Sequence, residues 1–161
     1  MELYLLRHGI AEDRAPSGRD ADRRLTEDGK KKLRRVLDRA AKAAVSPSLI
    51  LSSPLKRAIE TAEIAAEALQ YQGEIARTGA LTPDSSPRDV WAEIRAHRNQ
   101  ASILLAGHEP LFSHTLAWML GSTHTMVEFK KGALVRIDFE AIGVEPRGVL
   151  QWMLTAKLAH E

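Results

Sequence analysis

Short apolar runs alternate along this chain with segments that have the periodicity of amphipathic helices. The clearest runs are Leu3–Leu6, Leu49–Ser52 and Ser102–Ala106, and each is short enough to be a buried strand. Strands that alternate with helices form a largely parallel sheet that is covered on both faces. The alternation therefore predicts an α/β fold, a three-layer sandwich with a mostly parallel central sheet.

Four helices are expected in this pattern. The first is predicted from about Glu27 to Ala44, with Thr26 as its N-cap and apolar residues at steps of three and four. The second follows Ser53 and Pro54, which we expect to be its N-cap and first helical residue. The other two are expected near Arg88–His97 and between Pro110 and Gly121, and a weaker strand is expected around Glu74–Thr78.

The C-terminal part of the chain predicts a different strand arrangement. Two strands, about Ala133 to Phe139 and Val149 to Thr155, are separated by a segment with Gly143 and Pro146. This spacing predicts a hairpin or an antiparallel edge of the sheet. Because there is no repeat, low-complexity tract or linker, residues 1–161 are expected to form a single domain.

The composition excludes several classes of protein. There is no cysteine, which rules out disulfides and thiolate metal sites, and no other residues show metal-ligand spacing. The net charge of +2 gives little support for nucleic-acid binding, and no apolar run approaches the ~20 residues of a membrane helix. The N-terminus lacks the pattern of a signal peptide. We expect a cytoplasmic monomer that binds neither nucleic acid nor membranes.

Three loops that follow predicted strands carry the most unusual residues. They are Arg7-His8-Gly9, Ser53–Arg57 and Gly107-His108-Glu109. Taken singly, each fits a packed histidine or a solvated arginine. In a parallel sheet, however, the carboxyl ends of the strands meet at one edge, where ligands bind. Two arginines and two histidines would then lie together, and such a cluster favours a bound dianion.

The residues of this cluster suit phosphoryl transfer. A neutral imidazole at His8 can attack phosphorus if its other ring nitrogen donates to a backbone carbonyl, and Gly9 would let the backbone approach closely. Arg7, Arg57 and a hydrogen bond from His108 would surround the three equatorial oxygens. Arg57 lies in the first turn of a helix, where a bound anion would offset its unfavourable position. The positive charges are expected to lower the pKa of His8 below about 6.5.

An ordered set of motifs supports this interpretation. The set comprises Leu6-Arg7-His8-Gly9 with Ala11, Leu25-Thr26 with Gly29, Ser53-Pro54-Leu55-Lys56-Arg57-Ala58 with Thr61-Ala62, and Gly107-His108-Glu109-Pro110. It resembles the histidine phosphatase superfamily, the phosphoglycerate mutase-like branch of α/β proteins, and within it the SixA-type phosphohistidine phosphatases. The resemblance covers essentially the whole chain. It implies that His8 becomes phosphorylated, that Arg7, Arg57 and His108 bind the phosphoryl group, and that no metal or other cofactor is required.

The acid that would protonate the leaving group is less clearly marked. Many members of the superfamily carry it in the segment after the third strand, where the only acid here is Asp84. Asp84 is therefore a candidate substrate-binding residue, although its neighbours are also typical of a turn. Glu12, Asp13 and Glu109 are other candidates. Phosphohistidine loses an imidazole, which needs less help from an acid than an alkoxide does.

The substrate is inferred from loop length. Members that act on small phosphate esters often carry long insertions that close over the site, and the segment between Gly79 and Val90 leaves little room for a lid. We therefore expect a phosphorylated protein as the partner, with phosphohistidine in a signalling or phosphotransfer protein as the substrate. The alternative is a small phosphate ester.

Other classes of function are weaker alternatives. A catalytically silent module that binds phosphate or a phosphoprotein would keep the pocket, but the intact His8 argues against it. A nucleic-acid-binding domain would use Lys30-Lys31-Lys32 and Arg34-Arg35, but aromatic residues are only 5% of the chain. A mutase is also conceivable from the resemblance. The basic face of the first helix is more typical of a solvated face than of a docking surface.

Overall fold

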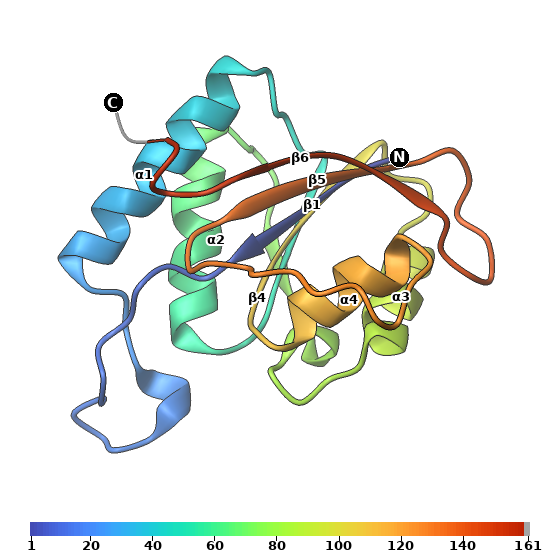
Figure 1. Cartoon of the computed structure of the whole chain (residues 1–161). Coiled ribbons are helices and arrows are strands. Elements are labelled where there is room, and N and C mark those ends of the chain that lie inside the picture. Colours follow the sequence, from blue (N-terminus) through green and yellow to red (C-terminus); the bar gives the residue numbers. More distant parts are fainter. Residues whose placement is uncertain (160–161) are drawn as a thin grey trace.

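In the computed structural model, which describes residues 1–159, the strands form one six-stranded sheet with the order β3-β2-β4-β1-β5-β6 (Figure 1). The strands are β1 (Glu2–Arg7), β2 (Leu49–Ser52), β3 (Ile75–Arg77), β4 (Ser102–Gly107), β5 (Leu134–Phe139) and β6 (Gly148–Leu154). The first four are parallel, whereas β5 pairs antiparallel with β1 and β6 antiparallel with β5. The predicted α/β fold is confirmed, and so is the antiparallel C-terminal pair.

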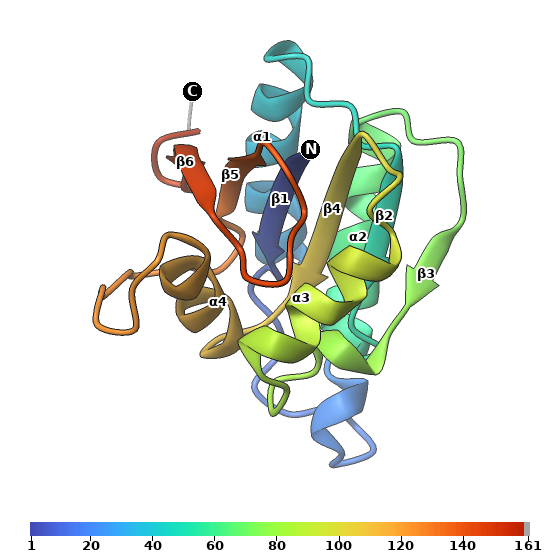
Figure 2. The ribbon, with the colours of Figure 1, turned by 90° about the vertical axis from the view of Figure 1, so that its right-hand side faces the viewer.

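The helices cover both faces of the sheet. They are α1 (Glu27–Lys42), α2 (Lys56–Ala68), α3 (Pro87–Ala96) and α4 (Leu111–Met119), with 3-10 turns η1 (Asp20–Asp22) and η2 (Gly79–Leu81). Figure 2 shows α1 and α2 on one face and α3 and α4 on the other. Side chains of β1 alternate between the two faces: Leu3 and Leu5 pack with α3 and α4, and Tyr4 and Leu6 with α1 and α2.

The helix boundaries confirm one predicted cap and correct another. The Thr26 hydroxyl accepts the N–H of Gly29 at 2.9 Å, as an N-cap does. At α2, however, Leu55 occupies the N-cap position without a side-chain cap, and the helix begins at Lys56. The predicted cap at Ser53 and the predicted first helical residue Pro54 are therefore wrong. The Ser53 hydroxyl contacts His108. The first helix ends at Lys42, two residues earlier than predicted.

The start of α1 is held against the loop that follows β1. The N–H of Thr26 donates to the carbonyl of Ile10 at 2.9 Å, and Ala11 forms an isolated antiparallel bridge with Leu25. Gly29 is required here because a Cβ at this position would overlap the Ile10 carbonyl oxygen. These contacts fix the backbone just after His8.

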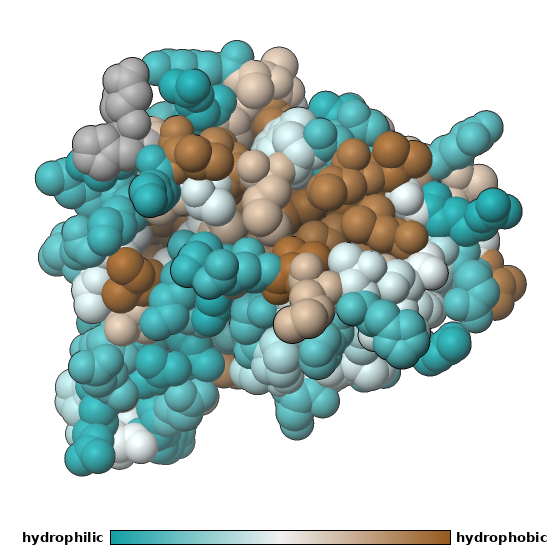
Figure 3. Space-filling view, viewed as in Figure 1, coloured by the Kyte–Doolittle hydropathy of each residue, from teal (hydrophilic) through white to brown (hydrophobic). Residues whose placement is uncertain are grey.

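The C-terminal strand β6 forms one edge of the sheet and exposes apolar side chains. Val149 is 62% exposed and Leu150 is 44% exposed. In Figure 3 an apolar area, drawn in brown, covers the part of the surface where β6 runs in Figure 1.

No helix within residues 1–159 combines the length and the apolar character needed to cross a membrane.

Candidate active site

His8 follows β1 at the carboxyl edge of the sheet and is 7% exposed. Its backbone N–H donates to the carbonyl of Gly107 at 2.9 Å, which ties it to the end of β4. Its Nδ1 lies 2.7 Å from the carbonyl oxygen of Gly9. A carbonyl can only accept, so Nδ1 carries the hydrogen in the neutral ring and Nε2 keeps a free lone pair.

The pKa of His8 is lowered to about 4, and burial is the largest cause. The hydrogen bond to Gly9 opposes this shift, and the charges of Arg57, Arg7 and Lys131 add to it. The predicted direction of the shift is correct, but its main cause is loss of hydration rather than the surrounding charge. The ring is neutral at physiological pH.

The backbone of Gly9 is in turn held by α2. Its N–H donates to the Thr61 hydroxyl at 3.2 Å, and that hydroxyl donates to the carbonyl of Arg57 at 2.7 Å. Thr61 is fully buried. This chain of hydrogen bonds fixes the carbonyl that orients the His8 ring.

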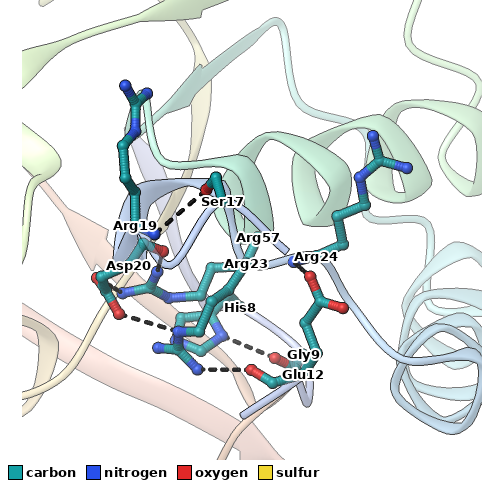
Figure 4. A network of polar contacts seen from close by, with 9 residues as sticks. All are labelled: His8, Gly9, Glu12, Ser17, Arg19, Asp20, Arg23, Arg24 and Arg57. Atoms are coloured by element: carbon teal, nitrogen blue, oxygen red, sulfur yellow. Dashed lines mark hydrogen bonds and ion pairs between the residues drawn. The ribbon is translucent and has the colours of Figure 1, made fainter. Parts of the chain in front are cut away.

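Arg57 lies in the first turn of α2, as predicted, and is 4% exposed. Its Nη1 donates to the backbone carbonyl of Asp20 at 3.0 Å and its Nη2 to the Asp20 carboxylate at 3.2 Å. Arg23 also donates to that carboxylate, at 2.9 Å. Figure 4 shows Asp20 bridging the two arginines, with Arg57 beside His8. The loop before α1 therefore fixes the guanidinium of Arg57.

Arg7 and His108 come from the ends of two neighbouring strands, β1 and β4. Arg7 is half-buried and its Nη1 donates to the carbonyl of Phe129 at 2.7 Å. His108 is 1% exposed, and its ring centroid is 5.2 Å from that of His8. Burial, followed by the nearby His8 and Arg57, lowers the pKa of His108 to about 3. The fold thus brings a second neutral imidazole against the first.

Three buried nitrogens of this cluster lack a hydrogen-bond partner. Within residues 1–159 six buried side-chain atoms have none, and three of these are Arg7 Nε, Arg57 Nε and His108 Nδ1. An unpaired buried donor costs about 1–3 kcal/mol. A tetrahedral oxyanion offers several acceptor oxygens at once, so the arrangement suits a phosphoryl group. The described residues include no group of three or more His, Asp or Glu side chains that could hold a metal ion.

The predicted acid is not part of the cluster's hydrogen bonds. Asp84 is exposed and accepts a hydrogen bond from the Thr82 hydroxyl at 2.8 Å within its own turn. In the described part of the chain no hydrogen bond or ion pair joins Asp84 to His8, Arg57 or His108. Its role in the reaction stays a prediction.

The other candidate acids have different surroundings. Glu12 accepts the backbone N–H of Arg24 at 3.0 Å, and Glu109 accepts that of Ser113 at 2.6 Å. Asp13 lines a small surface hollow in the loop before α1.

Two side chains at this edge were not predicted as site residues. Asp20 lies in a polar loop, and nothing in its sequence context marks it as a partner of Arg57. The sequence predicts Ser53 to be a helix cap, although its position between β2 and the helix that carries Arg57 is a usable signal. The carbonyl that anchors Arg7 belongs to the backbone of Phe129, so no side-chain pattern could reveal it.

The chain is similar to known proteins over most of its length. The family model of the histidine phosphatase superfamily (branch 1) matches residues 3–80. An uncharacterised protein of Picosynechococcus is 34% identical over 152 residues, which cover 90% of this chain and 89% of that protein.

Solved structures give the same result. The protein histidine phosphatase SixA in complex with tungstate has a TM-score of 0.88 and 26% identity, covering 98% of both chains. A protein from Agrobacterium tumefaciens, assigned as phosphohistidine phosphatase SixA, has a TM-score of 0.82 and 28% identity, covering 96% of this chain and 97% of that chain. Structures at 20% identity or less, including phosphatases named for phosphoserine and α-ribazole, share the fold.

Proposed function

The chain belongs to the histidine phosphatase superfamily, and we propose that it hydrolyses phosphohistidine in a protein through a covalent intermediate on His8. The observation that carries the reaction is the His8 ring, whose Nδ1 is held by Gly9 while Nε2 is free to attack. The unpaired donors of Arg7, Arg57 and His108 support a phosphoryl group at this place.

In the first step the Nε2 lone pair of His8 attacks phosphorus. The bond from phosphorus to the leaving group breaks, and the leaving group takes its electron pair and gains a proton from solvent water. Arg7, Arg57 and His108 would donate hydrogen bonds to the equatorial oxygens, where negative charge is concentrated in the transition state. The Nδ1–H of His8 continues to donate its hydrogen bond to the Gly9 carbonyl. This bond stabilises the positive charge that develops on the imidazole as it becomes phosphorylated.

In the second step water attacks the phosphorus of phosphorylated His8. The bond between phosphorus and Nε2 breaks, and its electron pair returns to the imidazole. One proton of the water is released to solvent, and the product is inorganic phosphate. The same three donors would stabilise both transition states, because the phosphoryl oxygens occupy the same positions throughout.

The choice of phosphohistidine rests on the leaving group and on the open site. An imidazole leaves more readily than an alkoxide and needs less help from an acid. Within residues 1–159, Asp20 is the one acidic side chain that is hydrogen-bonded to the His8–Arg57–His108 cluster, and its partner there is Arg57. Only a short exposed turn, with Asp84 at its centre, separates η2 from α3. This connection is too short to form a long lid, which leaves room for a phosphorylated side chain that is still attached to a protein. The resemblance to SixA supports the same choice.

A comparison of substrates tests this proposal. The kcat/KM of the purified protein would be measured for a phosphohistidine-bearing protein and for a panel of sugar phosphates, nucleotides and phosphoserine, with the His8→Ala variant as the blank. We expect the phosphohistidine protein to be preferred by at least tenfold. A large preference for one small ester would overturn the choice of substrate, and hydrolysis by the His8→Ala variant would overturn the mechanism.

A further inference from the structure

A hollow of about 590 Å³ adjoins the candidate site on the side of Arg7. Its walls come from four parts of the chain: the loop after β1, the first turns of α1, the loop before β5 and the segment after β6. Arg7 and Gly9, the two neighbours of His8 in the chain, both line it, so the hollow lies directly beside the candidate site. Its volume is within the range of ligand-binding pockets.

The hollow is strongly basic. Besides Arg7, its lining includes Lys32, Lys130, Lys131 and Lys157, and none of the described lining residues is acidic. This concentration of charge contrasts with the whole chain, whose net charge is only +2. Such a local field attracts an anionic ligand and raises its rate of association.

Two of these lysines pair with acids elsewhere on the surface. Lys130 lies 2.7 Å from Glu128, and Lys32 lies 3.1 Å from Asp28. All four side chains are well exposed, so these ion pairs contribute little and a ligand can displace them. Lys131 makes no ion pair among the described residues, and its charge acts on His8.

Apolar groups line the hollow between the charges. Ile10, Leu33 and Ala156 contribute to the lining, and Leu33 belongs to the core beneath α1. A small inorganic anion would leave this apolar surface uncovered. A peptide segment that combines acidic side chains with an aliphatic one would match both features.

We propose that this hollow binds an acidic segment of the phosphoprotein substrate, beside the phosphorylated residue. The inference rests on the proposed function, since it assigns the partner of that same site. It also changes the expectation for α1: Lys32, close to its N-terminus, takes part in docking, while the lysines on its outer face remain solvated.

Peptides that carry one phosphohistidine test this inference. Three glutamates, three glutamines or three lysines would flank that residue, and each peptide would compete with p-nitrophenyl phosphate. A peptide that occupies the site inhibits whether or not it is hydrolysed, and for a hydrolysed peptide the measured inhibition constant is its KM as a competing substrate. We expect the glutamate peptide to bind about tenfold more tightly than the lysine peptide in dilute buffer, with a smaller ratio in 0.5 M NaCl.

Charge-reversal variants test whether the lysines of the hollow cause the difference between the two peptides. In the variant Lys131→Glu with Lys157→Glu, the ratio of the two inhibition constants should fall to about one or invert. The matched control, Lys31→Glu with Lys42→Glu on the exposed face of α1, should keep the ratio of the wild type. Equal inhibition by all three peptides would overturn the inference. The inference would also be overturned if inorganic tripolyphosphate inhibited as strongly as the glutamate peptide and its inhibition depended on the same lysines. The hollow would then bind a small polyanion rather than a peptide.

These outcomes are separate from the failure of the proposed function. If wild-type protein does not hydrolyse p-nitrophenyl phosphate, or if hydrolysis does not need His8, the proposed function itself fails. If hydrolysis needs His8 but flanking charge has no effect, only the assignment of the hollow fails.

A second inference comes from an independent contact, between Ser53 and His108. The Ser53 hydroxyl accepts the N–H of Leu55 at 3.2 Å and lies 2.7 Å from Nε2 of His108. Both side chains are buried. A hydroxyl has one hydrogen to donate, and among its contacts within the described residues this ring nitrogen is the only group that could accept it.

We infer that Ser53 is a positioning residue that donates to Nε2 of His108 and so places the ring hydrogen on Nδ1. Nδ1 is the nitrogen that lacks a partner in the described structure. With the opposite tautomer, the neutral ring would turn a lone pair toward an anionic phosphoryl group and repel it. Ser53 thus converts a neutral histidine into a hydrogen-bond donor for the substrate.

Nitrogen NMR of ¹⁵N-histidine-labelled protein tests the tautomer directly. The His108 signals are identified by their loss in a His108→Asn variant. We expect the wild-type protein to show a protonated Nδ1 and an unprotonated Nε2 at pH 7. A protonated Nε2 in the wild type would overturn the inference, and this result requires no substitution at Ser53.

Removal of the hydroxyl tests its effect on the reaction. We expect Ser53→Ala to lower kcat for p-nitrophenyl phosphate about tenfold and to give a mixture of His108 tautomers. The control is Ser52→Ala, since the neighbouring Ser52 is equally buried but bonds to the backbone carbonyl of Ser53. If Ser53→Ala keeps both the wild-type kcat and the wild-type tautomer, the positioning role is wrong.

Discussion

Leu5 and His8 are close neighbours in the sequence, yet they lie in regions built in opposite ways. Leu5 belongs to a core in which apolar side chains pack on both faces of the sheet and are fully buried. His8 lies at the carboxyl edge, where a second histidine and Arg57 are also buried and several donors lack partners. The core stabilises the fold, whereas the edge holds groups that would be more stable in water. Such a cost is retained where a ligand offsets it.

The largest expected loss of activity comes from a substitution of His8, which should leave the stability of the core unchanged. We expect His8→Ala to lower the kcat for p-nitrophenyl phosphate by at least about 10⁴-fold, because it removes the proposed nucleophile. The free energy of unfolding, measured with urea at pH 7, should change by less than about 1 kcal/mol. A variant that lost activity only because it unfolded would contradict this division.

Substitution of Arg57 should also lower activity, but by less than substitution of His8. We expect Arg57→Ala to reduce kcat/KM by about 10²- to 10³-fold, because it removes a donor to the transition state. The neighbouring Lys56 is exposed and provides the control, since Lys56→Ala should leave kcat/KM within about twofold. Equal effects of the two substitutions would exclude Arg57 from the site.

A core substitution should behave in the reverse way. Leu37 of α1 is fully buried, and we expect Leu37→Ala to lower the free energy of unfolding by about 2–5 kcal/mol. Its kcat/KM under folding conditions should remain close to that of the wild type. The control, Arg34→Ala on the exposed side of α1, should change stability by less than about 0.5 kcal/mol.

The two regions should also respond differently to acid. Burial lowers the pKa of His8 to about 4 and that of His108 to about 3, while both histidines titrate near 6.5 in the unfolded chain. Between about pH 6.5 and pH 4 the unfolded chain therefore binds more protons, and stability falls as the pH falls through this window.

Unfolding curves at several pH values test this expectation. We expect His8→Ala to reduce the slope of stability against pH by up to about 1.4 kcal/mol per pH unit. Leu37→Ala should lower the whole curve without changing its slope. If His8→Ala keeps the wild-type slope, the ring is not held neutral by the fold.

Much of the fold and of the cluster follows from local patterns. The apolar runs beside His8 and His108 predict parallel strands, and parallel strands bring their carboxyl ends to one edge. That geometry is enough to place His8, Arg57 and His108 together. Thr26 and the C-terminal strand pair are also marked by short-range rules, namely capping and strand spacing.

The features that were missed depend on contacts between distant segments. Asp20 meets Arg57 across 37 positions of sequence, and Ser53 meets His108 across 55. No local sequence pattern indicates contacts between such distant residues, and the local pattern at Ser53 predicts a cap instead. The main cause of the low pKa of His8 is burial, which depends on how completely the neighbouring segments cover the ring. A sequence shows the charges of Arg7 and Arg57 but not how deeply the His8 ring is buried.

A covalent bond between His8 and phosphorus can be trapped chemically. The experiment is rapid mixing of the wild-type protein with a ³²P-labelled substrate, followed by quenching in alkali and peptide mapping. We expect label on the peptide that contains His8, stable in alkali and released by acid, and no label in the His8→Ala variant. Label on another residue, or a burst of product without label on His8, would contradict it.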